Sequence, residues 1–420
     1  MNPNEKGWLK QYIDFRKETL RELTSDSSRK QSHPEQSLYR IIQPTGLMYG
    51  QSSSTIGHPD QDSWHHRGRM KVLLAESLLS SAFLLRDNTS QSVDEAIANT
   101  LESIANFYNN IFPELATSQK TIFGKKKSAV EVVEKILDKR IERTIDFEEN
   151  FWTYFFHNSL LFLDVFIFGQ WIHTNADRIV ADFFRYEREE LRFSVVKVIA
   201  AAAHANLQVE YEEKKLLDFF LHSADLSSEK KKEALRIFED GIDVNEISLP
   251  SENSWILRKY FLEVAILTLW ADRKVDDVEM EFLRTFAIRL SFNEDDLENS
   301  LIAIEGFVLS NWEQLSYLQN KQDYEHVSEQ FIRRIATIAE KNVSRLAKEL
   351  SENEEAINLL KKSRSSELSP EEKETMRHAL VNVLKAIPTL AITSLPENFL
   401  TLPVLLKVIP KSLFTEGIPS

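Results

Sequence analysis

The stretch of this sequence with the most unusual chemistry is an apolar run, Phe151–Ile172, that contains the ionisable residues His157 and Asp164. Imidazole exchanges protons near neutral pH, and ionisable residues inside an apolar membrane segment often mark a proton or ion path. The polar side chains recur at intervals of three, four or seven, which places them on one helical stripe: Asn150, Thr153, His157, Asp164 and Trp171.

Three interpretations of this run stay open. As a helix its 22 residues would extend roughly 33 Å, enough to cross a bilayer, and the aromatic residues at both ends resemble an interfacial belt. A charged Asp at the bilayer centre costs roughly 2.5–3.5 kcal/mol, however. The run is therefore a buried bundle helix whose His157 and Asp164 bond to neighbours, a membrane-associated helix, or part of a proton or ion relay.

Other catalytic signatures are missing from the sequence. It contains no nucleophile with a paired base, no Gly-rich phosphate loop and no His-x-x-x-His pair. Paired carboxylates mean little among 65 acidic residues. We therefore predict a protein that is not an enzyme, with no catalytic residues and no cofactor beyond a candidate divalent cation.

Composition limits the class of protein further. The net charge of −14 argues against nonspecific nucleic-acid binding, which needs a basic surface. The absence of Cys excludes disulfides and thiolate metal sites. The N-terminus has no continuous apolar core, so it is not a signal peptide, and a cytoplasmic protein is expected.

The fold class follows from helical periodicity. Only 10 Gly and 12 Pro occur in 420 residues, a composition typical of helical proteins. The apolar spacing predicts an all-α multi-helix bundle whose expected helices include these six: Trp8–Leu23, Met70–Leu85, Val93–Ile111, Ala129–Thr144, Tyr324–Leu350 and a helix capped by Ser369 that runs to about Ile387. Beyond that last helix, Pro residues divide an apolar C-terminal tail into short pieces.

The centre of the chain, Leu191–Phe307, contains a duplication. A shift of 66 positions places Val195–Phe238 on Phe261–Ile304 with the apolar positions preserved. Each copy is predicted to form a helix, a short acidic turn, a second helix, a capped turn and a third helix. The sequence therefore predicts a duplicated three-helix unit.

The repeat resembles the tellurite-resistance TerB-like domain, whose acidic-turn signature corresponds to Ala205–Glu213 in the first copy and to Ala271–Glu279 in the second. The resemblance implies a divalent cation held by Asp272, Asp276 and Glu279. Helix capping is the alternative, because Asp276 and Glu279 have the spacing of a capping box, and acidic residues in a first turn favour the helix dipole. A Ca²⁺ or Mg²⁺ ion would in addition need about six oxygen ligands in all.

The C-terminal tail carries a second resemblance. The string 396–410 is similar to the membrane-proximal motif of the LETM family of mitochondrial inner-membrane proteins, in which the motif residues correspond to Pro396, Phe399, Leu402, Pro403, Lys407 and Pro410. The resemblance implies a role in cation/proton balance. In that family the motif leads into a ribosome-binding-like domain, whereas this sequence ends at Ser420, so ribosome binding is not expected.

Together these features resemble the LETM-related biofilm-associated protein family of Bacteroidetes. The expected regions are a helical N-terminal region (1–185), a TerB-like duplicated domain (186–310), amphipathic connecting helices (311–368) and a LETM-like segment (369–420). We expect a non-enzymatic scaffold or sensor in envelope or cation stress, cytoplasmic and associated peripherally with the inner membrane or a protein partner. The alternative is an integral inner-membrane factor for cation/proton exchange.

Overall fold

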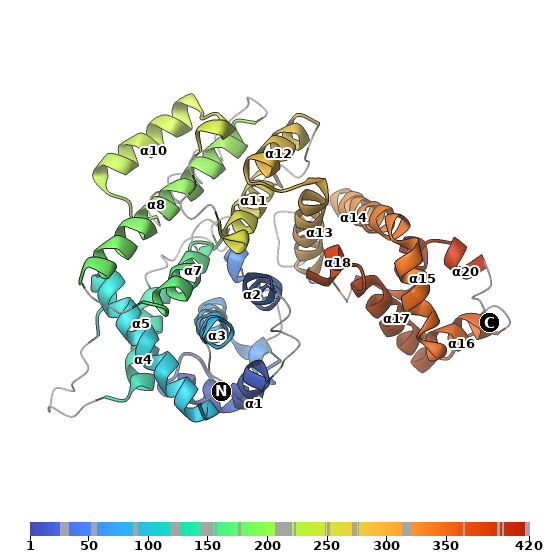
Figure 1. The fold of residues 1–420 in the computed structure, drawn as a ribbon, viewed down its shortest axis with the longest axis horizontal. Coiled ribbons are helices and arrows are strands. Elements are labelled where there is room, and N and C mark those ends of the chain that lie inside the picture. The colour runs from blue at the N-terminus through green and yellow to red at the C-terminus, as the bar shows by residue number, and fades with distance from the viewer. Residues whose placement is uncertain are drawn as a thin grey trace. The chain divides into compact units, whose positions relative to one another are not determined.

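A computed structural model provides the architecture of the chain (Figure 1). It describes residues 1–420 with the exception of these segments: 26–32, 52–56, 87–90, 118–126, 143–153, 156–157, 175–177, 206–220, 222–223, 248, 250–252, 271–274, 276, 313–320, 364–365, 393–394, 397–398 and 416–420.

The described residues form helices and turns, with no strand among them, so the predicted all-α class is confirmed. Within the same part of the chain, no helix combines the length and the apolar character needed to cross a bilayer.

The chain divides into two compact units. Unit 1 contains Met1–Ala271 and Val275–Phe282, and unit 2 contains Asp272–Lys274 and Leu283–Ser420. The helix α12 (Asp277–Arg289) has residues in both. The region boundaries expected from the sequence, at 185, 310 and 368, stay a prediction.

Unit 1 is built from nine labelled α-helices and five short 3₁₀ turns within its described residues. The helices are α1 (Trp8–Ser25), α2 (Pro34–Ile42), α3 (His66–Leu85), α4 (Val93–Ile111), α5 (Ala129–Glu142), α7 (Leu161–Trp171), α8 (Arg178–Ala203), α10 (Ser228–Asp240) and α11 (Trp255–Leu269). The 3₁₀ turns are η2 (Gln43–Thr45), η3 (Leu47–Tyr49), η4 (Gln61–Ser63), η5 (Pro113–Leu115) and η6 (Val244–Glu246).

Helix α3 is the centre of unit 1. It packs against α1, α2, α5 and α7, and every residue from Met70 to Phe83 is buried. The sequence predicted an amphipathic helix here, but burial on all sides leaves no solvent face, and the polar residues Lys71 and Glu76 are paired inside the unit. A Cβ at Gly169 of α7 would lie 2.9 Å from Leu85 Cδ1, so glycine allows α7 its close approach to α3.

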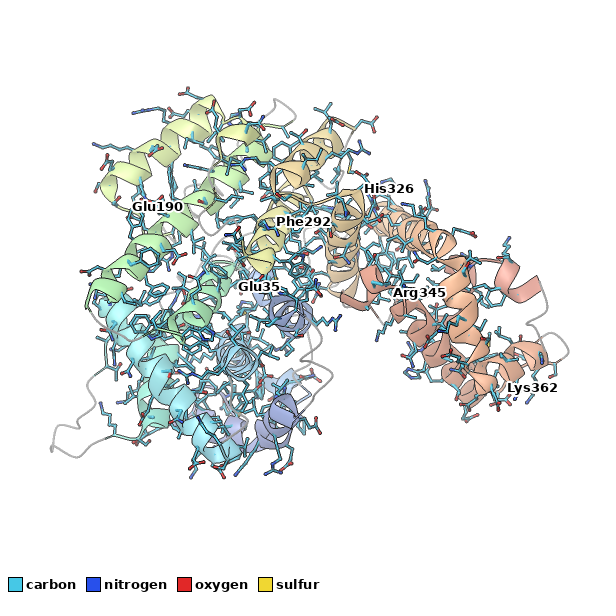
Figure 2. The ribbon with its side chains drawn as sticks, in the orientation of Figure 1. Glu35, Glu190, Phe292, His326, Arg345 and Lys362 are labelled. Carbon is cyan, nitrogen blue, oxygen red and sulfur yellow. The ribbon has the colours of Figure 1, made fainter. Side chains whose placement is uncertain are left out.

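The other layer of unit 1 contains α8, which packs against α7, α10 and α11, while α11 also packs against α2 (Figure 1). Glu35, which is labelled in Figure 2, lies at the start of α2. Its carboxylate accepts a hydrogen bond from the backbone N–H of Ile256, 3.0 Å away, at the start of α11. A carboxylate in this position satisfies a free N–H of the first turn and interacts favourably with the helix dipole.

The apolar run Phe151–Ile172 differs from the predicted 22-residue helix. Helix α7 spans only Leu161–Trp171, because Ser159 and Leu160 lie in a turn before it. Eleven residues extend roughly 16 Å, about half the hydrocarbon core of a bilayer. All of its residues except Gln170 are buried in unit 1, as the bundle-helix interpretation requires.

Unit 2 contains the C-terminal helices. They are α13 (Glu294–Ser310), α14 (Lys321–Lys341), α15 (Val343–Ser351), α16 (Glu354–Ser363), α17 (Pro370–Lys385), α18 (Pro388–Ile392), α19 (Leu402–Val408) and α20 (Ser412–Thr415). The predicted cap of α17 is confirmed: Ser369 Oγ accepts from Glu372 N at 3.2 Å, and Glu372 Oε2 accepts from Ser369 N at 3.0 Å.

The predicted single helix Tyr324–Leu350 is wrong. Asn342 leaves helical geometry at ψ 22° and separates α14 from α15. Its side-chain amide donates to the carbonyl of Ile338 at 2.8 Å, a local bond that competes with the helix ladder. The apolar positions still fall on one face, since Phe331, Ile335, Leu346 and Leu350 are all buried.

The helix ends agree with the spacing of the predicted duplication. Helix α8 ends at Ala203 and α11 at Leu269, while α10 begins at Ser228 and α13 at Glu294, so both pairs are separated by 66 positions. The middle of the first copy, 206–220, lies outside the described residues. The duplication therefore stays a prediction.

Candidate functional site

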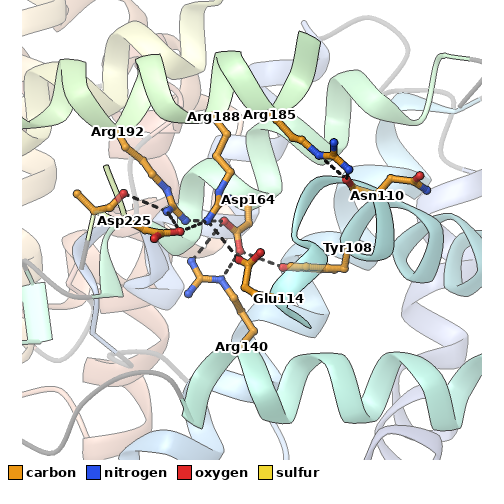
Figure 3. Close-up of polar contacts among 10 residues, drawn as sticks. Tyr108, Asn110, Glu114, Arg140, Asp164, Arg185, Arg188, Arg192 and Asp225 are labelled. Atoms are coloured by element: carbon orange, nitrogen blue, oxygen red, sulfur yellow. Dashed lines mark hydrogen bonds and ion pairs between the residues drawn. The ribbon is translucent and has the colours of Figure 1, made fainter. Parts of the chain in front are cut away.

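Asp164 is the centre of a buried ionic cluster in unit 1 (Figure 3). It lies on α7 with its side chain 1% exposed. Arg140 of α5 donates to it from Nε at 2.7 Å and from Nη2 at 3.4 Å. The hydroxyl of Tyr108, from α4, donates at 3.1 Å. The carboxylate thus joins three helices.

Two further arginines reach the cluster from α8. Arg192 Nη2 lies 4.0 Å from Asp164 Oδ1, and Arg188 Nη2 lies 3.5 Å from Glu114 and 3.0 Å from Asp225. Arg192 Nη1 is 3.8 Å from Asp225. The spacing of four residues places both arginines on one face of α8. Three cations therefore converge on three carboxylates.

An aromatic ring lies among these cations. The ring centroid of Phe112 is 4.1 Å from Arg188 Cζ, 5.8 Å from Arg140 Cζ and 6.0 Å from Arg192 Cζ. Phe112 is buried, so its π face attracts the guanidinium groups in a medium that screens charge weakly. The buried ring thus lies within about 6 Å of all three guanidinium groups.

The pKa values reflect this environment. Burial, followed by repulsion from Arg188 and Arg140, holds the pKa of Arg192 well below its usual range. Burial would also lower the pKa of Arg140, but the charge and hydrogen bonds of Asp164 outweigh it and raise that pKa. Burial, then the Asp164 charge, raises the pKa of Tyr108, so its hydroxyl keeps its proton and acts as a donor.

Two other buried carboxylates in unit 1 are also bonded internally. Glu263 of α11 accepts from Tyr39 at 2.5 Å and from Tyr49 at 2.8 Å. Glu76 of α3 accepts from Tyr12 at 2.6 Å and pairs with Arg16. Each cluster links segments that are distant in sequence, because buried charge is tolerated only where it is paired and hydrogen-bonded.

Unit 2 contains one comparable cluster among its described residues, centred on Arg334 of α14. Its Nε donates to Glu305 Oε1 at 2.9 Å, and its Nη1 donates to Glu298 Oε2 at 2.7 Å. Glu305 Oε2 is buried and has no hydrogen-bond partner in the described part of the chain. Burial raises the pKa of Glu305 to about 7, although Arg334 opposes the shift.

This pKa predicts a pH-dependent stability of unit 2. Because burial raises the pKa of Glu305 from its usual value of 4.5 to about 7, the stability contributed by its protonated form is fully present below about pH 4.5 and is lost as pH rises through about 7. We expect Glu305→Gln to remove a decline in unfolding free energy on the order of 3 kcal/mol between those values.

The measurement is hydrogen exchange of α13 peptides from pH 5 to 8, compared after correction for the intrinsic exchange rate. Glu340→Gln, an exposed position on α14, is the control and should keep the wild-type pH profile. Parallel profiles for wild type and Glu305→Gln would contradict the assignment.

The predicted cation ligands are only partly described. Glu279 lies on α12 and is buried, whereas Asp272 and Asp276 lie outside the described residues. Among the side chains that the structure does describe, no group of three or more His, Asp or Glu residues could hold a metal ion. The metal site at Asp272, Asp276 and Glu279 therefore stays a prediction, as does its alternative, the capping box.

The predicted ion-path residues have different outcomes. Asp164 is paired with Arg140, as the bundle-helix interpretation expected. His157 lies outside the described residues, so its part in an ion path stays a prediction.

The LETM-like motif lies in unit 2, where its first residues pack on other helices. A Cβ at Gly306 of α13 would lie 3.1 Å from Pro396 Cδ, so glycine makes room for the proline ring. The ring centroid of Phe399 is 5.5 Å from that of Phe331. Pro396 and Pro410 are buried, Leu402 is half-buried, and Pro403 and Lys407 are exposed. The motif residues thus contribute both to the core and to the surface of unit 2.

No family model, curated protein or solved structure matches this chain. The resemblances described from the sequence therefore rest on the quoted residues alone. Sequence reasoning found Asp164 but missed its ion-pair partners, Arg140 and Arg192, and the neighbouring Arg188, which pairs with Glu114 and Asp225. The available signal was the pair of arginines four residues apart on a helix that also carries apolar residues.

Proposed function

We propose that the protein is a non-enzymatic helical scaffold or sensor that associates peripherally with a membrane or a protein partner. The observation that carries this proposal is the Asp164 cluster. Its contacts join α4, α5, α7 and α8 to one another, so the charges of the cluster are used for holding helices together. The same use of buried charge recurs at Glu263 and Glu76.

A peripheral association is supported by exposed aromatic side chains on α8. Phe183 is 60% exposed and Tyr186 is 63% exposed, and the two lie three residues apart on one face of the helix. Large exposed aromatic residues are enriched at surfaces that contact a partner. The resemblance to LETM-related biofilm-associated proteins supports the link to envelope or cation stress.

The alternative function is an integral inner-membrane factor for cation/proton exchange with His157 and Asp164 in its path. Two observations weigh against it. Helix α7 is 11 residues long, and Asp164 is paired with Arg140 within a packed bundle.

Fractionation of cells that produce the full chain separates the two functions. We expect the protein in the soluble fraction, or in a membrane fraction from which salt or carbonate releases it. Retention in the membrane after carbonate extraction, with release by detergent only, would contradict the scaffold and favour the integral factor.

A cation-sensing role makes a separate prediction. If the acidic turn binds Ca²⁺, Mg²⁺ or Mn²⁺, we expect Asp272→Asn with Glu279→Gln to weaken binding by at least about tenfold, because hard cations need charged oxygen ligands. The measurement is a calorimetric titration of the full chain with each cation. The control is Glu294→Gln with Asp295→Asn, the same charge change at the start of α13. Absent or equal binding would leave capping as the role of these carboxylates.

A further inference from the structure

In the Asp164 cluster the positive side chains are more deeply buried than two of the three carboxylates. The side chains of Arg140 and Arg188 are each 14% exposed, that of Arg192 is 3% exposed, and that of Asp164 is 1% exposed. The other two carboxylates lie nearer to water, since the side chain of Glu114 is 27% exposed and that of Asp225 is 65% exposed. Three well-buried guanidinium groups thus face one fully buried carboxylate.

Two buried N–H groups of this cluster lack a hydrogen-bond acceptor among the described residues. These are Arg188 Nε and Arg192 Nε. A buried donor on a charged group is rarely left unsatisfied in a folded protein, and an unseen ion or water is a common explanation. Repulsion between the arginines adds to the effect of burial in lowering the pKa of Arg192, consistent with an excess of positive charge.

Asp225 is the replaceable member of the cluster. It precedes α10 in a left-handed backbone conformation, with φ at 49°, which is uncommon for a residue other than glycine. Its carboxylate lies 3.0 Å from Arg188 Nη2 and 3.8 Å from Arg192 Nη1. It therefore presents an anion to both arginines from the solvent side, where another anion can compete for them.

We propose that Arg188 and Arg192 form a binding site for a phosphate group, and that the Asp225 carboxylate occupies the rim of this site as an internal competitor. Guanidinium groups match phosphate oxygens with paired hydrogen bonds. A dianion also balances two cations better than a single carboxylate does. The scaffold proposal does not depend on phosphate binding, because the bonds of Arg140 and Tyr108 to Asp164 involve neither Asp225 nor the anion.

The test is a calorimetric titration of the full chain with inorganic phosphate at constant ionic strength, with chloride as the reference anion. We expect phosphate to bind and Asp225→Asn to bind it about tenfold more tightly, because the competing charge is removed. Asparagine suits the left-handed conformation, so this variant should fold. Arg188→Gln should abolish binding.

A matched control is available on the same helix. Arg185 donates to the Asn110 carbonyl at 2.8 Å and pairs with Asp182, outside the cluster. Arg185→Gln removes the same charge and should leave phosphate binding unchanged. A parallel titration with vesicles that contain phosphatidic acid identifies the source: binding to vesicles alone assigns a lipid headgroup, and binding of inorganic phosphate assigns a free anion.

Two outcomes would overturn the proposal. One is the absence of binding in both titrations, for wild type and for Asp225→Asn. The other is phosphate binding that Asp225→Asn does not strengthen or that Arg185→Gln weakens as much as Arg188→Gln does. The second outcome would indicate general attraction of an anion to surface charge.

Discussion

Asp164→Leu is expected to lower the unfolding free energy of unit 1 by roughly 3–5 kcal/mol, the usual cost of removing one partner from a buried ion pair. Leucine keeps the branching of aspartate at Cγ but is larger and carries neither a charge nor an acceptor, so the substitution removes the ion pair and its hydrogen bonds. Arg140 would lose two hydrogen bonds, and Arg192 would lose the buried carboxylate that lies 4.0 Å from its Nη2. Tyr108 would lose its acceptor.

Hydrogen exchange of peptides from α7 and α5 measures this effect locally, which matters because a chain with two compact units need not unfold in one step. Asp182→Asn is the control. Asp182 pairs with Arg185 on the surface of α8, so the change should alter stability by no more than about 0.5 kcal/mol. Equal effects of the two substitutions would mean that Asp164 does not hold the bundle together.

The second large effect is expected in the LETM-like segment. Leu405 of α19 is fully buried where this helix packs against α14 and α17, so Leu405→Ala should destabilise unit 2 by about 2–5 kcal/mol. Its neighbour Leu406 is 40% exposed, and Leu406→Ala should cost less than about 1 kcal/mol.

Exchange rates of α14 and α17 peptides compare the two leucine variants. A large loss of protection from Leu405→Ala alone would support a structural role for this segment in the core of unit 2. Equal losses, or none from either variant, would contradict the packing of α19. The comparison holds the residue type and the helix constant, so only burial differs.

Local signals predicted the helices well. The bounds of α4, Val93–Ile111, agree with the expected helix at both ends, and Ser92 with Glu95 forms a capping box at its start. The start of α17 was equally clear, since Ser369, Pro370 and Glu372 act within one turn. Such caps depend on residues three positions apart, so the sequence itself contains the whole interaction.

The structure departs from the predicted helices for tertiary and for local reasons. Periodicity alone does not show that α3 is covered on every side, because that depends on which helices surround it. The break at Asn342 is a local exception, because its side-chain amide donates to the carbonyl of Ile338 four residues earlier, and apolar periodicity does not report such a bond. The helix expected at 151–172 is interrupted by the turn at Ser159 and Leu160, because an apolar run predicts burial but not the position of a turn.

The ionic cluster was beyond sequence reasoning. Arg140 and Asp164 are 24 positions apart, and Arg188 meets Asp225 across 37 positions, so no motif connects them. The sequence indicated Asp164 as a candidate only because this charged residue interrupts an apolar run. Of the predicted cation ligands, only Glu279 is described, and for that reason the acidic turn remains to be tested by titration.

A double-mutant cycle between Asp164 and Arg140 tests the central claim, that this buried pair holds unit 1 together as a scaffold. The variants are Asp164→Leu, Arg140→Met and the two combined, each measured by hydrogen exchange of α5 and α7. We predict that the combined variant is more stable than the sum of the single losses implies, with a coupling energy on the order of 2 kcal/mol. Additive losses, with no coupling between the two positions, would contradict the claim.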